Sequence, residues 1–433
     1  MGHSVTKLVI FMIVALGLAG ITGRPLEAAS HLWVNPALSQ LIEEGLTNNK
    51  ELQSLEAKVE SLKEEISFAG SLDDPRLGIG VINLPTDTFS FDQEAMTQKQ
   101  IFVAQKVPWF GKLSLKEQRQ ALIAGRQQAI LEARHLELAR KIATNYYELG
   151  FIATSLEINR RLTEMVSQII KVAETRYASG SGLQHDVLQA QVELSKFLDE
   201  KIMLQKKRRI LEDRINELLN RESFIRIAPP KNLSDPKIRL DVETLKAISL
   251  RKNPWLRVRQ FDVDRVAVEI DLAKKDYWPD MDFKVAYGQR EEDFMGRDLP
   301  DLITASVVVN IPLWQRNRQD KKLEANRKNY KAATKSYESF TKSLPYRIDA
   351  LATDIHDTQE NYRLFSDALM IQAEQWARSS LSAYVVNKVE FNTMINAQMR
   401  LLRFELKSMR YLFNVYQKRA ELEEILGGPL VPE

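Results

Sequence analysis

Two stretches in the second half of the chain alternate between apolar positions and polar or small ones. The apolar positions are Met281, Phe283, Val285 and Tyr287 in the first stretch and Ile303, Ala305, Val307, Val309 and Ile311 in the second. A weaker copy in the first half has apolar positions at Leu77, Ile79 and Val81, followed by Ile101, Val103 and Val107. Because side chains along a strand point to alternate faces, this pattern predicts four strands, each with one apolar face.

Each predicted strand is about ten residues long, which is enough to cross a bilayer when the strand is tilted. A soluble, half-buried sheet would show the same alternation, but two features favour a membrane. Aromatic residues gather just outside the strand ends on one side, as in an interfacial girdle; they are Trp109, Phe110, Tyr277, Trp278 and Trp314. The loops inside the two hairpins, 85–96 and 291–301, are longer than a hairpin needs. Four strands cannot close a barrel, since about eight is the practical minimum, so the strand count predicts an oligomer.

The pattern changes to helical spacing in two long segments. No proline interrupts residues 113–178, and the 66 residues of this segment would extend roughly 100 Å as one helix. The matching segment 313–386 contains Pro345, which is expected to kink or break the helix. A heptad of apolar residues follows it at Ile395, Met399, Leu402, Leu406, Met409, Phe413, Tyr416 and Ala420. Since a second helix follows each long one after a short turn, the heptads predict antiparallel helical hairpins.

The chain contains the same sequence of elements twice. Residues 48–81 pair with 252–285, and residues 102–112 pair with 306–316, at an offset of 204. RYASGSGLQHDVLQAQVEL (176–194) pairs with AYVVNKVEFNTMINAQMRL (383–401) at an offset of 207. Each half therefore reads helix, proline, strand, loop, strand, proline, long helix, turn, helix. A repeat of this size indicates duplication around a symmetry axis rather than a solenoid, whose periods are about 20–50 residues.

This reading gives a fold that mixes α and β, mainly α, and the following domains. Residues 1–30 are a signal peptide, 31–230 the first structural repeat, 231–428 the second structural repeat and 429–433 a C-terminal tail. The first repeat holds a helix, a β-hairpin at 76–107 and a helical hairpin at 112–220; the second holds a helix, a β-hairpin at 280–311 and a helical hairpin at 313–427. Pro229, Pro230 and Pro236 prevent the linker between the repeats from being one helix.

The N-terminus has the three parts of a secretory signal. Lys7 precedes a 14-residue apolar core, Leu8–Ile21, and Ala28-Ala29-Ser30 supplies small residues for cleavage. A transmembrane anchor is the alternative, but the apolar core is short for a span of about 20 residues.

Composition removes several classes of function. The formal charge is only +3, so nothing marks a nucleic-acid footprint. The absence of cysteine excludes disulfides, thiolate metal sites and thiol nucleophiles. The chain has no nucleotide-binding or HExxH motif, and the histidines His31, His135, His185 and His356 are scattered, so we expect no metal site, no cofactor and no enzyme activity.

The hairpin tips are predicted at 179–182 and 386–389, where Gly180 and Asn387 coincide in the repeat. Glycine and asparagine are the residues that accept the left-handed conformation in which many helices end. The two tips are therefore expected to share one backbone conformation, with glycine in the first tip and asparagine in the second.

The paired tip sequences resemble the tip motif of the TolC family of outer-membrane efflux proteins, broadly Tyr-x-x-Gly followed by Asp-x-Leu-x-Ala-Gln. The resemblance covers nearly the whole chain after the signal, and FDQEAMTQKQIFVAQKVPWFGK (91–112) is most similar to the CusC and CzcC metal-efflux branch. It implies a homotrimer with a 12-stranded barrel in the outer membrane and a helical tunnel across the periplasm. It also implies docking of the tips onto a periplasmic adaptor protein that is bound to an inner-membrane pump.

By position, the resemblance assigns the adaptor-facing residues to the tips. These residues are Ser179, Gly180, Ser181, Asn387 and Lys388. Relatives constrict the periplasmic entrance with acidic residues, but the matching positions here are the uncharged Thr393 and Asn396. Asp186 and Glu390 are the nearest acids, which leaves an acidic gate in doubt.

The predicted function is an export channel, with metal cations as one candidate substrate. Alternatives are the duct of a type I protein secretion system, a periplasmic coiled-coil adaptor and a soluble scaffold. Adaptors usually carry one helical hairpin where this chain has two, and a scaffold leaves the amphipathic strands unexplained.

Overall fold

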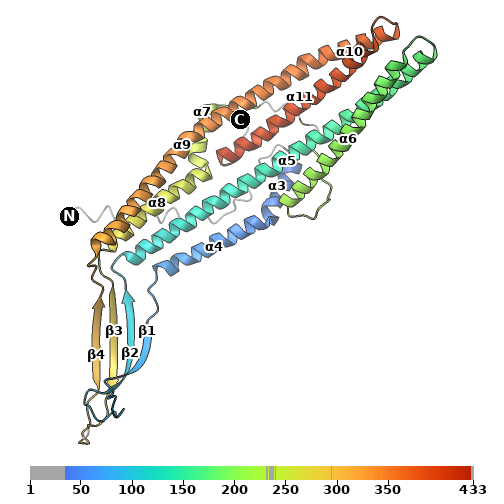
Figure 1. Cartoon of the computed structure of the whole chain (residues 1–433). Coiled ribbons are helices and arrows are strands. Elements are labelled where there is room, and N and C mark those ends of the chain that lie inside the picture. Colours follow the sequence, from blue (N-terminus) through green and yellow to red (C-terminus); the bar gives the residue numbers. More distant parts are fainter. Residues whose placement is uncertain (1–34, 231–232, 234–237, 239, 294, 431–433) are drawn as a thin grey trace. The chain divides into compact units, whose positions relative to one another are not determined.

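The computed structural model describes residues 35–230, 233, 238, 240–293 and 295–430 (Figure 1). The predicted signal peptide, His31, Pro236 and the end of the predicted tail lie outside the described residues. In chain order the elements are α3 (Pro36–Asn48), α4 (Lys50–Gly70), β1 (Arg76–Ile82), β2 (Gln98–Val107), α5 (Lys112–Ala178), α6 (Gln184–Leu218), α7 (Val242–Lys252), α8 (Pro254–Lys275), β3 (Met281–Gln289), β4 (Leu302–Val309), the 3-10 turn η1 (Gln315–Asn317), α9 (Gln319–Arg363), the π-helical turn η2 (Leu364–Leu369), α10 (Met370–Val385) and α11 (Phe391–Leu426). The predicted mainly helical class and the order of elements in both repeats are confirmed.

The chain divides into two compact units that do not coincide with the repeats. One unit consists of Ser54–Glu132 and Pro254–Ser343 and contains the strands; we call it the sheet unit. The other consists of the described residues up to Gln53, Ala133–Asn253 and the described residues from Leu344; we call it the tip unit. Each unit takes corresponding segments from both repeats, as expected when a duplicated chain packs its two halves side by side.

In the sheet unit the four strands form one antiparallel sheet in the order β1-β2-β3-β4 (Figure 1). The register places Leu77, Val103, Val285 and Ala305 in one row. The predicted apolar positions therefore share one face across all four strands. On the opposite face, Lys284 lies over the ring of Phe102 at 4.0 Å. A Cβ at Gly78 would lie only 2.3 Å from that ring, so a larger residue here would require the Phe102 ring to move.

A buried lysine joins the sheet to the helices of the same unit. The Nζ of Lys112 donates to Asp280 Oδ1 at 2.8 Å and lies 3.7 Å from Asp276, and the backbone N–H of Trp109 donates to the same Asp280 oxygen at 2.9 Å. Trp109 stacks on Trp278 with ring centroids 4.9 Å apart. Partial burial raises the pKa of Asp280, but the hydrogen bonds from Lys112 and from the Trp109 N–H and the positive charge of Lys112 together lower it below its ordinary value. We call this cluster the inner junction.

In the tip unit one side-chain contact is made by equivalent residues of both repeats. Asn49 lies between α3 and α4 in an extended conformation, and Asn253 lies between α7 and α8 in the same conformation. The Asn49 Nδ2 donates to the carbonyl of Leu218 at 3.2 Å, and the Asn253 Nδ2 donates to that of Ile425 at 2.8 Å. The two acceptors are themselves 207 positions apart, so the structure confirms the repeat that the sequence predicted.

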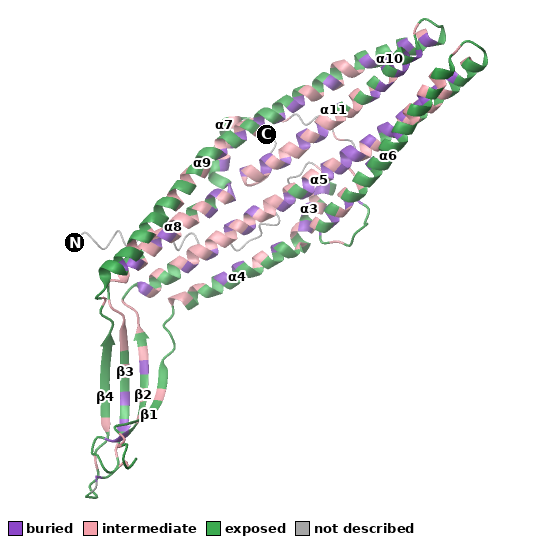
Figure 2. Cartoon of the chain, viewed as in Figure 1, coloured by how far each residue is buried: buried purple, intermediate pink, exposed green. Residues whose placement is uncertain are grey.

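The two helical hairpins of the tip unit, α5 with α6 and α10 with α11, share one apolar core (Figure 2). Its buried members are Ile158, Leu162, Val166, Ile169, Ala173, Ala190, Phe197, Tyr384, Phe391, Met394, Ile395, Met399 and Leu402. The apolar positions of the helices therefore pack against one another in a single core, which confirms the predicted helical hairpins. Among the described residues, no helix is long and apolar enough to cross a membrane.

Of the kink or break expected at Pro345, the break is not observed, because α9 continues through this residue as far as Arg363. Leu344 and Ile348 on either side are fully buried. Proline removes one backbone hydrogen bond, and the burial of these two side chains stabilises the helix on both sides of it. The irregularity in this segment is instead the π-helical turn η2 at Leu364–Leu369, where Phe365 packs on Phe404 and Tyr411.

Candidate functional site

The two hairpin tips have the same backbone. Gly180 has a φ of +72° and Asn387 a φ of +59°, so both residues are left-handed, as predicted. The N–H of Gly180 donates to the carbonyl of Tyr177, and the N–H of Asn387 donates to that of Tyr384. In each tip the next residue donates five positions back, at 2.9 Å from Ser181 and 2.8 Å from Lys388. These are the hydrogen bonds of a helix end closed by a left-handed residue.

One arginine links the first tip to the second. The guanidinium of Arg176 donates to the carbonyl of Tyr384 at 2.7 Å and to the side-chain oxygen of Asn387, and it lies 4.3 Å from the centre of the Tyr384 ring. It also donates to the carbonyl of Ser181 in its own tip. A planar guanidinium with several donors suits such a bridge. Sequence reasoning missed Arg176; the available signal was that the equivalent position of the second repeat is Ala383, so only the first repeat carries the arginine.

The other tip residues predicted to face a partner are accessible. Ser179, Ser181 and Lys388 are exposed, and the hydroxyls of the two serines lie 2.8 Å apart. Exposed apolar side chains flank both turns, namely Tyr177, Leu183 and Leu188 at the first tip and Val385 and Val386 at the second. The tips therefore present backbone, hydroxyls, one ammonium group and apolar side chains to solvent.

The four residues predicted for the entrance are divided between two helices. Asp186 lies in the first turn of α6, Glu390 immediately precedes α11, and Thr393 and Asn396 are exposed on α11. The side chains of Gln189 and Asn392 form a hydrogen bond that joins the two helices beside them.

Asp186 also acts on the second tip electrostatically. Burial raises the pKa of the Tyr384 hydroxyl, the nearby Arg176 lowers it, and the Asp186 carboxylate raises it again. The Tyr384 hydroxyl therefore stays protonated near neutral pH. Of the four predicted entrance residues, Asp186 is the one whose charge acts on Tyr384.

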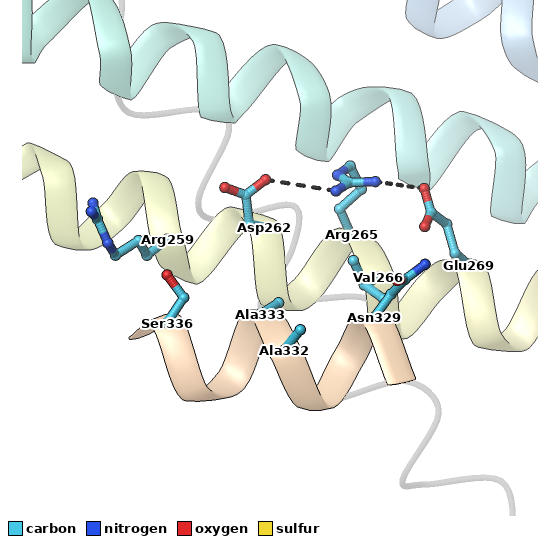
Figure 3. Close-up of a pocket in the computed structure, with 9 residues that line it drawn as sticks. All are labelled: Arg259, Asp262, Arg265, Val266, Glu269, Asn329, Ala332, Ala333 and Ser336. Atoms are coloured by element: carbon cyan, nitrogen blue, oxygen red, sulfur yellow. Dashed lines mark hydrogen bonds and ion pairs between the residues drawn. The ribbon is translucent and has the colours of Figure 1, made fainter. Parts of the chain in front are cut away.

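The sheet unit contains a hollow of about 410 Å³ between α8 and α9 (Figure 3). Its charged residues neutralise one another: Arg265 bridges Asp262 and Glu269, Asp262 also accepts from Arg126 at 2.9 Å, and Arg259 lies over the ring of Phe340. Since each charge has a partner inside the protein, the hollow does not indicate a ligand.

The histidines are dispersed in the structure too. His185 and His356 are exposed, and His135 is half-buried on α5. Over the described ranges, no group of three or more histidine, aspartate or glutamate side chains is placed to hold a metal ion.

Comparison with known proteins identifies a family for the first repeat. The model of the outer membrane efflux protein family matches residues 41–221. This range runs from α3 to the end of the first helical hairpin. No curated protein is similar enough in sequence to match.

Solved structures share the fold over nearly the whole chain. The outer-membrane channel OprN is 17% identical with a TM-score of 0.77, covering 91% of this chain and 90% of that one. CusC, which forms a transmembrane channel, is 14% identical with a TM-score of 0.78, covering 95% and 96%. The outer membrane protein VceC of Vibrio cholerae is 17% identical with a TM-score of 0.76, covering 90% and 96%. At these identities the similarity shows a common fold.

Proposed function

We propose that the chain, of which residues 41–221 match the model of the outer membrane efflux protein family, is the outer-membrane channel of a tripartite efflux system. Proteins of this family are transport channels, so the chain is not an enzyme. It acts in the cell outer membrane and extends into the periplasm. In the proposed system an adaptor protein and an inner-membrane pump supply the substrate and the energy.

The continuous apolar face of the sheet carries the proposal. All four strands contribute to it, and its side chains are exposed, for example Leu77 at 70% and Ile79 at 84%. Burying such a face in lipid is favourable, whereas leaving it in water is not. Phe110, Trp278 and Trp314, at 71%, 53% and 77% exposure, lie beyond the strand ends where aromatic rings anchor a protein at a membrane interface.

The strand count requires an oligomer, and the family resemblance implies that this oligomer is a homotrimer. Three copies of four strands make a 12-stranded barrel, and three copies of the tip unit contribute twelve helical segments to a tunnel. The polar face of the sheet, with Arg76, Lys106 and Lys284, would then line the barrel.

The exposed tips are the proposed adaptor-docking surface. Ser179, Gly180 and Ser181 come from the first tip and Asn387 and Lys388 from the second. Arg176 holds these two loops together, so the adaptor would meet one preorganised surface rather than two independent loops. Asp186, Glu390, Thr393 and Asn396 remain the proposed entrance residues, and metal cations remain a predicted class of substrate.

Single-channel recording of the purified protein in planar bilayers tests the proposal. We expect discrete conductance steps, and we expect the protein to require detergent in solution. A protein that stays dissolved without detergent and produces no conductance would contradict the proposal and favour a periplasmic adaptor or scaffold.

A further inference from the structure

The charged side chains on the polar face of the sheet all lie at the end next to the helices. Arg76, Lys284 and Ser306 lie in one row of the register. The next row toward the helices has Lys106 opposite Asp282. The rows toward the loops hold uncharged residues, which are Gly78, Phe102, Ala286, Thr304, Gly80, Gln100, Gly288, Leu302, Ile82 and Gln98. Arg76, Lys106, Asp282 and Lys284 therefore form one charged layer, which we call the basic layer.

Two lysines give the basic layer an uncompensated positive charge. Arg76 and Asp282 form an ion pair at 2.5 Å, so these two charges offset each other. Lys284 lies over the ring of Phe102, which attracts the ammonium group without removing its charge. Neither Lys284 nor Lys106 forms an ion pair with a described residue. Each chain therefore contributes a net charge of +2 to the layer, and three chains contribute +6.

The segments just beyond this end of the sheet leave that charge in place. They contain four acids and at least as many bases, among them Asp73, Asp74, Asp276, Asp280, Lys112, Arg316, Arg318 and Lys322. Asp276 pairs with Lys322 at 2.6 Å, and Asp280 pairs with Lys112 at 2.8 Å. The two acids before β1 are matched in number by the two arginines after β4, so these segments add no net negative charge.

The loops at the other end of the strands are acidic. Residues 83–97 include three acids and no lysine or arginine, and residues 290–301 include five acids and two arginines. The two loops are joined, because Arg290 Nη1 donates to the carbonyl of Ala95 at 3.1 Å and Lys99 pairs with Glu291 at 2.5 Å. These contacts hold both loops at the end of the sheet. We call the two loops together the acidic mouth.

We propose that the barrel attracts anionic solutes at the basic layer, through Lys106 and Lys284, and disfavours them at the acidic mouth. This inference rests on the proposed trimeric channel, because only a closed barrel makes the polar face a lumen. A pore wall with one sign of charge concentrates solutes of the opposite sign. The basic layer repels a bare metal cation, so the class of substrate that it favours is a solute with negative charge.

Charged thiol reagents test this difference, because the full chain contains no cysteine of its own. Ser306→Cys places one thiol in the row of Lys284, and Ser90→Cys places one in the acidic mouth. The trimer of each variant is treated at about 0.1 M salt with a methanethiosulfonate that carries a sulfonate, and separately with one that carries a trimethylammonium group. The ratio of the two reaction rates is divided by the same ratio for a small free thiol, and this corrects for the different reactivity of the reagents.

We expect the normalised ratio of sulfonate to trimethylammonium reaction to be at least about fivefold higher at Ser306→Cys than at Ser90→Cys. The difference should shrink at about 1 M salt, because the screening length falls from about 10 Å to about 3 Å. The measurement requires no current, so it also applies to a channel whose entrance at the tips is closed.

Two matched variants assign the effect to the lysines. Adding Lys106→Gln and Lys284→Gln to Ser306→Cys removes two positive charges, and we expect its ratio to fall at least about threefold. Adding Lys106→Arg and Lys284→Arg instead keeps both charges, and the ratio should stay within about twofold of that of Ser306→Cys alone. A fall in both variants would mean that side-chain shape, not charge, decides the rates, and this would overturn the inference.

The remaining outcomes separate this inference from the proposed function. A trimer with equal ratios at the two thiols, or with the higher ratio at Ser90→Cys, would overturn the inference and leave the channel in place. A high ratio at Ser306→Cys that survives the glutamine substitutions would show that other groups attract the anion, which also overturns it. A protein that forms no trimer would contradict the proposed function, and the inference with it.

Discussion

At the first tip the left-handed residue is Gly180, at the second it is Asn387, and the same two hydrogen bonds close both turns. The surroundings of the two tips differ. Arg176 of the first tip donates hydrogen bonds to the second tip, whereas the equivalent position of the second repeat is Ala383. The two repeats thus share one tip backbone, and their side chains differ where the two tips are in contact. The repeats have the same fold but different roles in joining the tips.

A second difference between the repeats lies near the C-terminal ends of α6 and α11. Asn216 of the first repeat and Glu423 of the second occupy equivalent positions, and both are buried, at 1% and 2% exposure. Asn216 donates to the carbonyl of Ile225 at 2.8 Å. Glu423 accepts from Arg419 at 3.1 Å and from the N–H of Leu430 at 3.3 Å. One repeat therefore buries a neutral amide where the other buries an acid beside an arginine.

The largest expected effects on stability come from substitutions at buried positions that the two repeats share. Ala190 and Ala397 are equivalent and fully buried. We expect Ala190→Leu and Ala397→Leu each to lower the free energy of unfolding by about 1–3 kcal/mol, because the added carbons do not fit a packed core. Denaturant unfolding followed by circular dichroism measures this change. The neighbouring Gln191→Leu, at an exposed position, is the control, and a neutral result for only one alanine would show that the two cores are not equivalent.

Asn49→Ala and Asn253→Ala test the contacts that the repeat duplicates. Each substitution leaves a partly buried carbonyl near a helix end without its donor, and we expect a loss of about 1–2 kcal/mol from each. The losses should add within about 0.5 kcal/mol, since the two sites share no partner. The exposed Asn48→Ala serves as the control in the same unfolding assay. A loss from only one of the two would indicate that the repeats have diverged here.

Arg176→Ala tests what only the first tip possesses. We expect a loss of about 1 kcal/mol that is confined to the tips, because two hydrogen bonds to the second tip disappear. Hydrogen exchange should accelerate at residues 384–388, although the substitution lies in the other hairpin. Arg160→Ala is the control, since Arg160 pairs only with Glu157 and Glu164 of its own helix. Unchanged exchange at 384–388 would mean that Arg176 does not hold the second tip.

Glu423→Gln is expected to have the smallest effect, and it should depend on pH. Burial raises the pKa of Glu423, although Arg419 lowers it in part. Between the ordinary glutamate pKa and the raised one, the folded protein binds more protons than the unfolded protein, so the free energy of unfolding falls as the pH rises through that window. The amide does not titrate, so the variant should lose this dependence and gain stability relative to the parent above the window.

Thermal unfolding between pH 4 and pH 8 measures the difference between the two proteins. Glu174→Gln, at an exposed position, is the control and should follow the parent. A constant difference between parent and Glu423→Gln at every pH would contradict a raised pKa at this position.

Local chemistry made much of this molecule predictable. The alternation of apolar residues gave strands whose observed ends differ by at most two residues from the predicted hairpins, and Gly180 and Asn387 marked both tips. Contacts between distant segments were not predictable in this way. Arg176 bonds to a carbonyl 208 positions away, which no local pattern encodes. Pro345 shows the converse, because local propensity predicted a kink or a break there, whereas the helix continues through it between the buried Leu344 and Ile348.

The central claim is that one duplicated chain is a third of a channel. Native mass spectrometry of the protein extracted from outer membranes in a mild detergent tests this directly. The account predicts a particle of three chains and no stable population of single chains. A folded particle of one chain, under conditions where the sheet and both tips remain intact, would contradict it.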